Sequence, residues 1–203
     1  MYQAWRQGKA WSKAFTVGNL EVYGGSWLRE WPVNFPKTDL FLRLSDGSFD
    51  KFAPVASLND AGNWAWPGLR AALPETVPTL DLDWPDGLVP FVDAKFWKEL
   101  VLQLHMRQEG SVDPIVLRVA CQGGMGRTGT ALSIIYGLLT GSDDPITHVR
   151  KLYSQTAVEQ PAQVNYVADM LGKDMPAHVM KETLYPSWLD YAGKKQDGPV
   201  QIG

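Results

Sequence analysis

The chain has 203 residues, of which 45% are hydrophobic, and this is enough to bury one sizeable core. Its formal net charge of -3 excludes the basic excess with which proteins bind nucleic acid or an anionic membrane surface, so any anion site must be local. A single cysteine excludes both an intramolecular disulfide and a metal site built from several thiolates.

One domain is expected over residues 1–192, followed by a flexible tail over 193–203, where the sequence turns polar and contains glycine. Charged residues interrupt the apolar ones in the first thirty positions, and no later stretch reaches the roughly 20 apolar residues of a membrane span. The expected location is therefore the cytoplasm, with neither a membrane nor a nucleic acid as partner.

Glycine and proline punctuate the chain before about residue 93, which favours short strands and loops over long helices. Strands are predicted over 19–23, 40–44 and 79–82. Asp81 and Asp83, which alternate with Leu80 and Leu82 in and just after the third of these, are assigned to the solvent face. Tryptophan is abundant in the first third, where it indicates either a loop-rich packing layer or an aromatic surface facing a ligand or partner. These tryptophans are Trp5, Trp11, Trp27, Trp31, Trp64 and Trp66.

Helical spacing begins after Asp93, which is expected to cap a helix that continues until about residue 110. A run rich in branched apolar side chains at 114–120 predicts a buried, central strand that stops at Cys121. The glycine-rich turn 122–126 then leads into a helix over 130–139 that is apolar nearly all round and therefore buried. Two more helices are predicted at about 144–154 and 161–171, and this order of elements predicts an α/β domain.

The segment 121–129, which joins the buried strand to the buried helix, has the composition of an anion cradle. Its glycines allow a tight turn with several backbone N–H groups pointing inward, and the helix dipole adds to the attraction for a phosphate dianion. Arg127 can grip two phosphate oxygens with its planar guanidinium. Because the same field stabilises a thiolate, Cys121 is the candidate nucleophile, and Thr128 places a hydroxyl within reach of the sulfur.

Other interpretations fit parts of this segment. A lone cysteine at the end of an apolar strand is often only a small buried hydrophobe. The glycines at 124, 126 and 129 match a dinucleotide-binding fingerprint, but the acidic residues at 143 and 144 come too early for it, and a Walker loop would need a lysine after its last glycine. We therefore expect no cofactor, and the three histidines, which show no metal-ligand spacing, predict no metal site.

The pattern Cys-x5-Arg-Thr, between an apolar strand and a helix, resembles the phosphate loop of the protein tyrosine and dual-specificity phosphatase superfamily. Upstream, the sequence at 84–86, Trp-Pro-Asp, resembles the mobile acid loop of that superfamily, in which the aspartate is the general acid. Downstream, the segment 158–167 resembles the place of a water-positioning glutamine. Gln163 is at the matching position, and Gln160 is a competing candidate. The resemblance covers about residues 79–171.

The resemblance implies a phosphatase-like fold, with a central, mostly parallel sheet flanked by helices and a loop-rich, tryptophan-rich first third. It implies metal-independent hydrolysis of phosphate monoesters, phosphotyrosine and/or phosphoserine/threonine in proteins, through a phosphocysteine intermediate. The partner is then a phosphorylated protein or peptide. Catalytic roles are implied for Cys121, Arg127, Asp86, Thr128 and Gln163. Contacts to the substrate are implied for Gln122, Gly123, Gly124, Met125, Gly126, Arg127 and Trp84.

Ala120 departs from the family pattern, which usually has a histidine directly before the cysteine. This departure keeps open a second function, that of a catalytically silent phosphate-binding module. A third, a phosphatase acting on nucleotide or RNA 5′ phosphates, is disfavoured by the acidic charge balance. Asp86 also fits a plain Pro-Asp-Gly turn, and the uncharged loop residues 122–126 disfavour highly phosphorylated inositols as substrates.

Overall fold

The computed structural model describes residues 8–27, 29, 37–45, 69–72, 78–109, 111–181 and 183. The predicted flexible tail over 193–203 lies outside the described residues. So do four of the tryptophans of the first third, Trp5, Trp31, Trp64 and Trp66. Among the described residues, no helix is long and apolar enough to cross a membrane.

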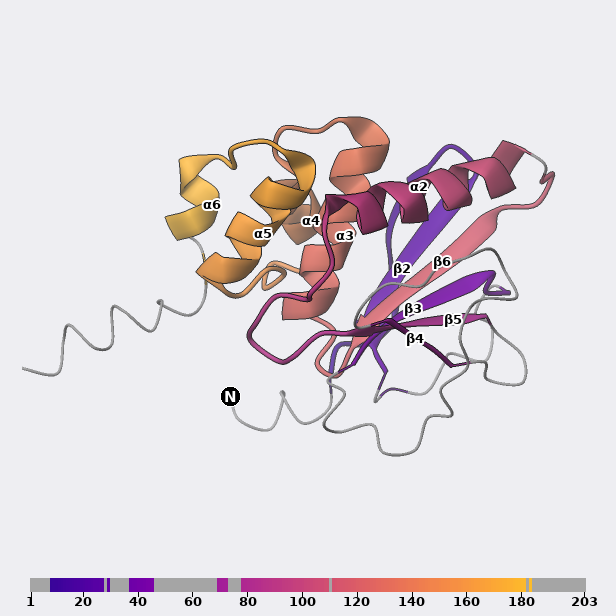
Figure 1. Cartoon of the computed structure of the whole chain (residues 1–203), viewed down its shortest axis with the longest axis horizontal. Helices are drawn as coiled ribbons and strands as arrows, with labels where there is room; N and C mark the ends of the chain where they lie inside the picture. Colours follow the sequence, from indigo (N-terminus) through magenta and orange to yellow (C-terminus); the bar gives the residue numbers. More distant parts are fainter. Residues whose placement is uncertain are drawn as a thin grey trace, which may run out of the picture.

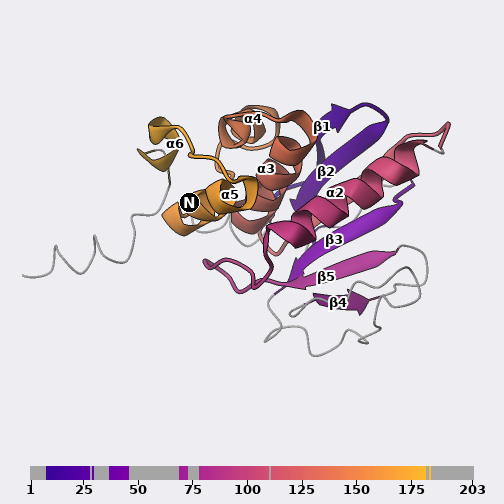
Figure 2. The same cartoon turned by 45° about the horizontal axis from the view of Figure 1, so that its top comes forward.

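A six-stranded mixed sheet forms the centre of the molecule, in the order β1-β2-β6-β3-β5-β4. The inner strands β2, β6, β3 and β5 run parallel to one another. β1 and β4 pair antiparallel at the two edges, and Figure 2 shows both of these edge strands. This confirms the prediction of a mostly parallel sheet. The strands are β1 Ser12–Val17, β2 Leu20–Ser26, β3 Leu40–Ser45, β4 Leu69–Ala72, β5 Thr79–Asp83 and β6 Ile115–Cys121.

The four strands predicted from the sequence are the four inner strands of the sheet, which the structure therefore confirms. The two edge strands were not predicted. β1 carries lysine and threonine on its exposed side, and β4 is a four-residue piece that contains two alanines, so neither has the run of branched apolar residues typical of a buried strand.

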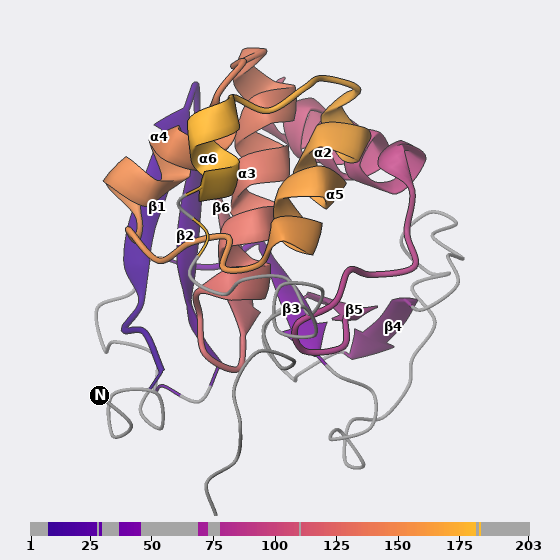
Figure 3. The ribbon, with the colours of Figure 1, turned by 90° about the vertical axis from the view of Figure 1, so that its left-hand side faces the viewer.

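Five helices of the described chain cover one face of the sheet (Figure 1). α3 lies in the middle of this layer, with α4 and α5 on either side of it (Figure 3). Asp93 caps the first helix as predicted, because its carboxylate accepts hydrogen bonds from Lys95 N–H at 2.9 Å and Phe96 N–H at 3.2 Å. The bounds are α2 Ala94–Glu109, α3 Gly126–Thr140, α4 Pro145–Leu152, α5 Pro161–Leu171 and α6 Ala177–Lys181, of which α6 was not predicted.

The core lies between the sheet and the helical layer, and β6 is buried along its whole length. Leu117, Val119 and Cys121 face the helices, while Ala120 points to the other face and packs with Trp11 and Phe41. The two rings meet edge to face with centroids 6.1 Å apart, which supports the packing interpretation for this tryptophan. β6 therefore delivers Cys121 from the most buried part of the fold.

The assignment of Asp81 to the solvent face of its strand is wrong. The residue is 1% exposed, and its carboxylate accepts hydrogen bonds from Arg43 Nε at 3.1 Å and from Ser45 Oγ at 2.7 Å. Arg43 lies directly opposite on β3, so a cross-strand pair satisfies the buried charge. Alternation within one strand cannot reveal a partner on its neighbour.

We expect Gly129→Ala to lower the free energy of unfolding by about 1–3 kcal/mol, because the new Cβ would overpack a close contact between α3 and the chain before α5. That Cβ would lie 2.5 Å from Ala157 Cβ and 2.8 Å from its Cα. Gly137→Ala in the same helix is the control, since its Cβ would meet only the tip of the Leu171 side chain, at 2.6 Å. Urea unfolding of both variants measures the difference, and equal costs would contradict the packing argument.

Candidate active site

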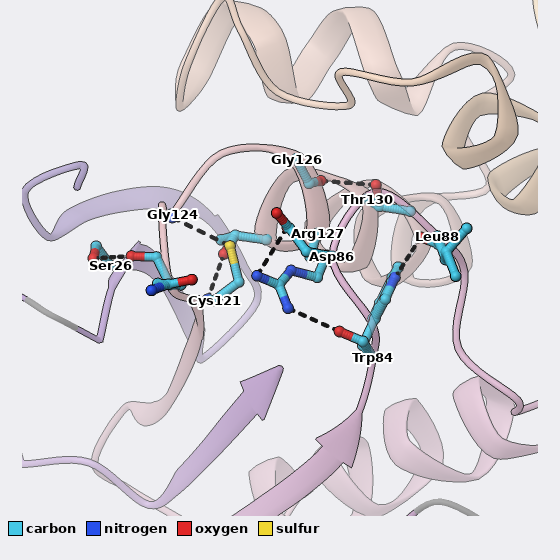
Figure 4. Close-up of polar contacts among 11 residues, drawn as sticks. Ser26, Trp84, Asp86, Leu88, Cys121, Gly124, Gly126, Arg127 and Thr130 are labelled. Atoms are coloured by element: carbon cyan, nitrogen blue, oxygen red, sulfur yellow. Dashed lines mark hydrogen bonds and ion pairs between the residues drawn. The ribbon is translucent and has the colours of Figure 1, made fainter. Parts of the chain in front are cut away.

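The site lies where two parallel strands end at the same edge of the sheet, the usual location of ligand sites in α/β proteins. β6 ends at Cys121 and continues through the loop 122–125 into α3. β5 ends at Asp83 and is followed by a segment that carries Asp86 and leads to α2. Figure 4 shows the side chains of Cys121, Asp86 and Arg127 next to one another.

The loop 122–125 curls around the cysteine sulfur. Gly124 N–H donates a hydrogen bond to Cys121 Sγ at 3.2 Å, and Thr128 Oγ1 accepts one from Cys121 N–H at 2.8 Å. Gly124 adopts a φ of 76°, and a Cβ at this position would lie 2.6 Å from the carbonyl carbon of Gly25 in β2. Only glycine therefore allows this turn so close to the sheet.

The remaining loop residues differ in exposure. Gln122 is exposed, Gly123 and Met125 are partly exposed, and Gly126 is buried at the start of α3. The hydroxyl of Thr128 fixes the main chain that carries the sulfur. Its predicted hydrogen bond to the sulfur itself stays a prediction.

Arg127 is 4% exposed, and its guanidinium joins the two parts of the site. Nη1 donates to the carbonyl oxygen of Trp84 at 2.8 Å, and Nη2 lies 3.0 Å from Asp86 Oδ1. Nε–H is buried and has no hydrogen-bond partner among the described residues. A buried donor of this kind costs about 1–3 kcal/mol until an acceptor binds it, so this edge of the guanidinium is ready for an oxyanion.

The segment with Asp86 is anchored at its base and exposed at its tip. Trp84 is completely buried, and it meets Trp97 and Tyr166 edge to face at centroid distances of 6.3 and 5.8 Å. Its indole N–H donates to Leu88 O at 2.8 Å, which closes the turn around Asp86, whose side chain is 79% exposed. Trp84 thus reaches the site through its carbonyl oxygen, and its side chain packs in the core rather than facing a substrate.

Comparison with known proteins agrees with this geometry. A solved structure of PTPMT1 in complex with PI(5)P superposes with a TM-score of 0.51 at 12% sequence identity, and the match covers 80% of this chain and 94% of that one. Tyrosine-protein phosphatase 1 of Caenorhabditis elegans is 34% identical over 94 residues, which are 43% of this chain and 9% of that protein. The likeness to PTPMT1 shows that the chain has the fold of the protein tyrosine and dual-specificity phosphatases.

The chain also has a relative whose match spans most of both proteins. The uncharacterized protein MJ0215 of Methanocaldococcus jannaschii is 35% identical over 154 residues, which are 76% of this chain and 86% of that protein. No protein-family model matches the chain. The comparisons therefore show the fold, and the activity is argued from the site.

A buried carboxyl, that of Glu159, lies next to Gly126 of the phosphate loop. Its carboxylate accepts a hydrogen bond from Gly126 N–H, and its Oε1 is buried with no hydrogen-bond partner among the described residues. Burial, and next the negative charge of Asp86, raise the pKa of Glu159 to about 7, against the opposing effects of the Gly126 N–H and the Arg127 guanidinium. Glu159 therefore changes charge near neutrality beside the place where a phosphate would bind.

The backbone directly before Glu159 is strained and is held in place by a side chain of α4. Val158 has a φ of 60°, a left-handed conformation that is costly for a β-branched residue. The buried guanidinium of Arg150 binds the carbonyl oxygens before and after the Val158 Cα. It donates from Nε to Ala157 O and from Nη2 to Val158 O, each at 3.0 Å. This brace directs Glu159 towards the loop.

Gln163, rather than Gln160, lies beside the phosphate loop. Its Oε1 accepts hydrogen bonds from Glu159 N–H at 2.9 Å and Gln160 N–H at 3.2 Å, and its Nε2 would be 3.2 Å from a Cβ placed on Gly126. Gln160 is the N-cap residue of α5. The placement favours Gln163 of the two candidates, and its role in positioning water stays a prediction.

Sequence reasoning assigned no role to Glu159, although it lies in the segment that contains Gln163. A glutamate before Gln-Pro at a helix start looks like an ordinary solvated residue. The signal lies in its neighbours in space, because Asp86, Gly126 and Arg127 come from other parts of the chain.

We expect Glu159→Gln to remove a pH dependence of anion binding. The raised pKa means that the wild-type carboxyl is neutral below about pH 7 and negative above it. Sulfate keeps its charge over this range, so its affinity for the wild type should fall as the pH rises through 7, while the variant should stay level and bind about tenfold more tightly at pH 8. Calorimetric titrations at several pH values measure this. The exposed Glu109, in α2, provides the matched Glu109→Gln control, and parallel profiles for all three proteins would contradict the placement of Glu159.

Proposed function

We propose that the chain is a phosphatase that hydrolyses phosphate monoesters through a phosphocysteine intermediate. The observation that supports this most is the convergence of three groups at the N-terminus of α3. They are the Cys121 sulfur, the Asp86 carboxylate and the Nε–H of Arg127, which has no hydrogen-bond partner in the described part of the chain. A nucleophile, an oxyanion-binding donor and a proton carrier are what transfer of a phosphoryl group requires.

In the first step the Cys121 thiolate attacks phosphorus, the S–P bond forms and the bond to the leaving oxygen breaks. Protonated Asp86 gives its proton to that oxygen. The inward-facing loop amides and Arg127 bind the phosphoryl oxygens, and the positive end of the α3 dipole stabilises their negative charge.

In the second step water attacks the phosphocysteine, Asp86 takes a proton from it, and the S–P bond breaks with the electron pair returning to sulfur. The Gly124 N–H, 3.2 Å from Sγ, stabilises the departing thiolate. Gln163 positions the water, and Thr128 assists the departure of the sulfur. Inorganic phosphate and the free thiolate are the products, so the cycle closes without a cofactor.

We propose phosphorylated proteins or peptides as the substrate class. The residues 122–126 contribute no positive charge beyond their amides, which suits one phosphate group rather than several. Leu88 and Phe91 follow Asp86 and are 58% and 81% exposed, so they offer an apolar contact to the group that carries the phosphate. PTPMT1 has been solved with a phosphoinositide, PI(5)P, and such a lipid is the competing substrate to assay beside phosphopeptides.

Ala120 favours a second candidate function, a phosphate-binding module without turnover. This alanine stands where the family usually has a histidine, directly before the cysteine. It packs against Trp11 and Phe41 on the face of the sheet away from the helices. Binding of phosphate without hydrolysis of any ester by the wild type would support the module and overturn the phosphatase.

Cys121→Ser is expected to abolish hydrolysis of an aryl phosphate and to retain phosphate binding, because the cradle persists while the hydroxyl is a poor nucleophile. Steady-state assays and calorimetry measure the two properties. Turnover by the serine variant at more than about one hundredth of the wild-type rate would contradict the nucleophile assignment.

Asp86→Asn is expected to lower kcat by about 10²–10⁴-fold for an alkyl or phenyl phosphate, whose leaving oxygen needs a proton. The loss should shrink for a nitro-substituted phenyl phosphate, which leaves readily as an anion. Asp174→Asn changes another exposed carboxylate and serves as the matched control. An equal loss for both leaving groups would show that Asp86 acts other than as the acid.

A further inference from the structure

Every carbonyl oxygen of the phosphate loop from Cys121 to Met125 accepts a hydrogen bond. Trp27 N–H donates to Cys121 O at 3.1 Å, Lys9 N–H donates to Gly123 O at 2.9 Å, and Gly129 N–H donates to Met125 O at 2.7 Å. The other two donors are side chains: Ser26 Oγ donates to Gln122 O, and Tyr153 Oη donates to Gly124 O. No carbonyl of this stretch is left to turn inward.

These bonds decide where the loop amides point. In a planar trans peptide the C=O and the following N–H point in opposite directions, so a carbonyl held outside the loop aims the next N–H inside. The Lys9 bond to Gly123 O demonstrates this, because the following N–H, that of Gly124, donates to Cys121 Sγ. By the same geometry Ser26 aims the N–H of Gly123, and Tyr153 aims the N–H of Met125.

We propose that Tyr153 is a positioning residue of the phosphatase site, which orients the Gly124–Met125 peptide for phosphate binding and does so together with Ser26. The inference rests on the proposed function. It assigns to two hydroxyl groups from outside the loop part of the support that other family members receive from the histidine replaced here by Ala120.

The fold provides a seat for this tyrosine. Tyr153 directly follows α4 and is 6% exposed. A Cβ on Gly24 would lie 2.6 Å from its Cε2, so β2 carries a glycine where the ring passes to reach the loop. The Lys9 ammonium lies 4.7 Å from the centroid of the Tyr153 ring, and the backbone N–H of the same lysine donates to Gly123 O.

The hydroxyl is a constant donor. Burial, and next the negative charge of Cys121, raise the pKa of Tyr153 well above its ordinary value, so the group keeps its proton at neutral pH. A tyrosinate would instead repel both the Gly124 carbonyl and the sulfur.

Tyr153→Phe tests the proposal, because it keeps the ring and removes only the donor. We expect kcat/KM for an aryl phosphate to fall about tenfold to a hundredfold, mainly through kcat, since the amides contact the transition state more strongly than the substrate. The affinity of the Cys121→Ser protein for inorganic phosphate should fall about tenfold when Tyr153→Phe is added. Tyr136→Phe, on α3, is the matched control and should leave both quantities within about twofold of their starting values.

Amide NMR separates positioning from plain stability. The proposal predicts that Tyr153→Phe shifts the Met125 amide resonance and reduces its response to phosphate, at a temperature where the variant is fully folded. If Tyr153→Phe does not fold, Ser26→Ala is measured in the same way, with the Gly123 amide as the reporter. Unchanged kcat, phosphate affinity and amide response would overturn the proposal while leaving the phosphatase intact. A wild type that neither binds phosphate nor turns over an ester would overturn the proposed function, and this positioning role with it.

Discussion

The site depends on the direction of a few peptide planes. A loop of glycines has no intrinsic preference for turning its N–H groups inward, and its carbonyl oxygens would otherwise face the sulfur and repel both a thiolate and a phosphate. Here groups before β1, at the end of β2 and directly after α4 bind those carbonyls from outside, so that the amides and the start of α3 present one positive surface to Cys121. The tight approach of Gly124 to β2 follows from this constraint.

Features that ordinary cores avoid are gathered around the same loop. Arg127 has a buried donor that meets no acceptor among the residues that the structure describes, Glu159 is a carboxyl whose pKa is raised by burial, and Val158 has a left-handed backbone. Elsewhere the buried charge of Asp81 is paired and the interior between sheet and helices is apolar. Such unfavourable local conformations persist where the surrounding structure stabilises them. Here Arg150 holds the backbone at Val158, and the aromatic contacts of Trp84 fix the carbonyl oxygen that binds Arg127.

The sequence predicted the parts of this arrangement that depend on neighbours along the chain. Local patterns predicted the inner strands and four of the helices, and the resemblance to the phosphatase motifs implied that Cys121, Arg127 and Asp86 lie together. It could not predict the partners that meet only in space. Tyr153 and Glu159 look like ordinary residues of a helix end and a helix start, and Asp81 looked exposed because its Arg43 partner lies on another strand. The short edge strand β4 lacked a hydrophobic pattern to identify it.

A crystal structure with bound vanadate tests the central claim most directly. The account predicts vanadium bonded to Cys121 Sγ, with its oxygens bound by the N–H groups of the loop and by Nε of Arg127. Vanadate bound elsewhere, or bound here while carbonyl oxygens of the loop face it, would contradict the claim that the fixed peptide planes create the site.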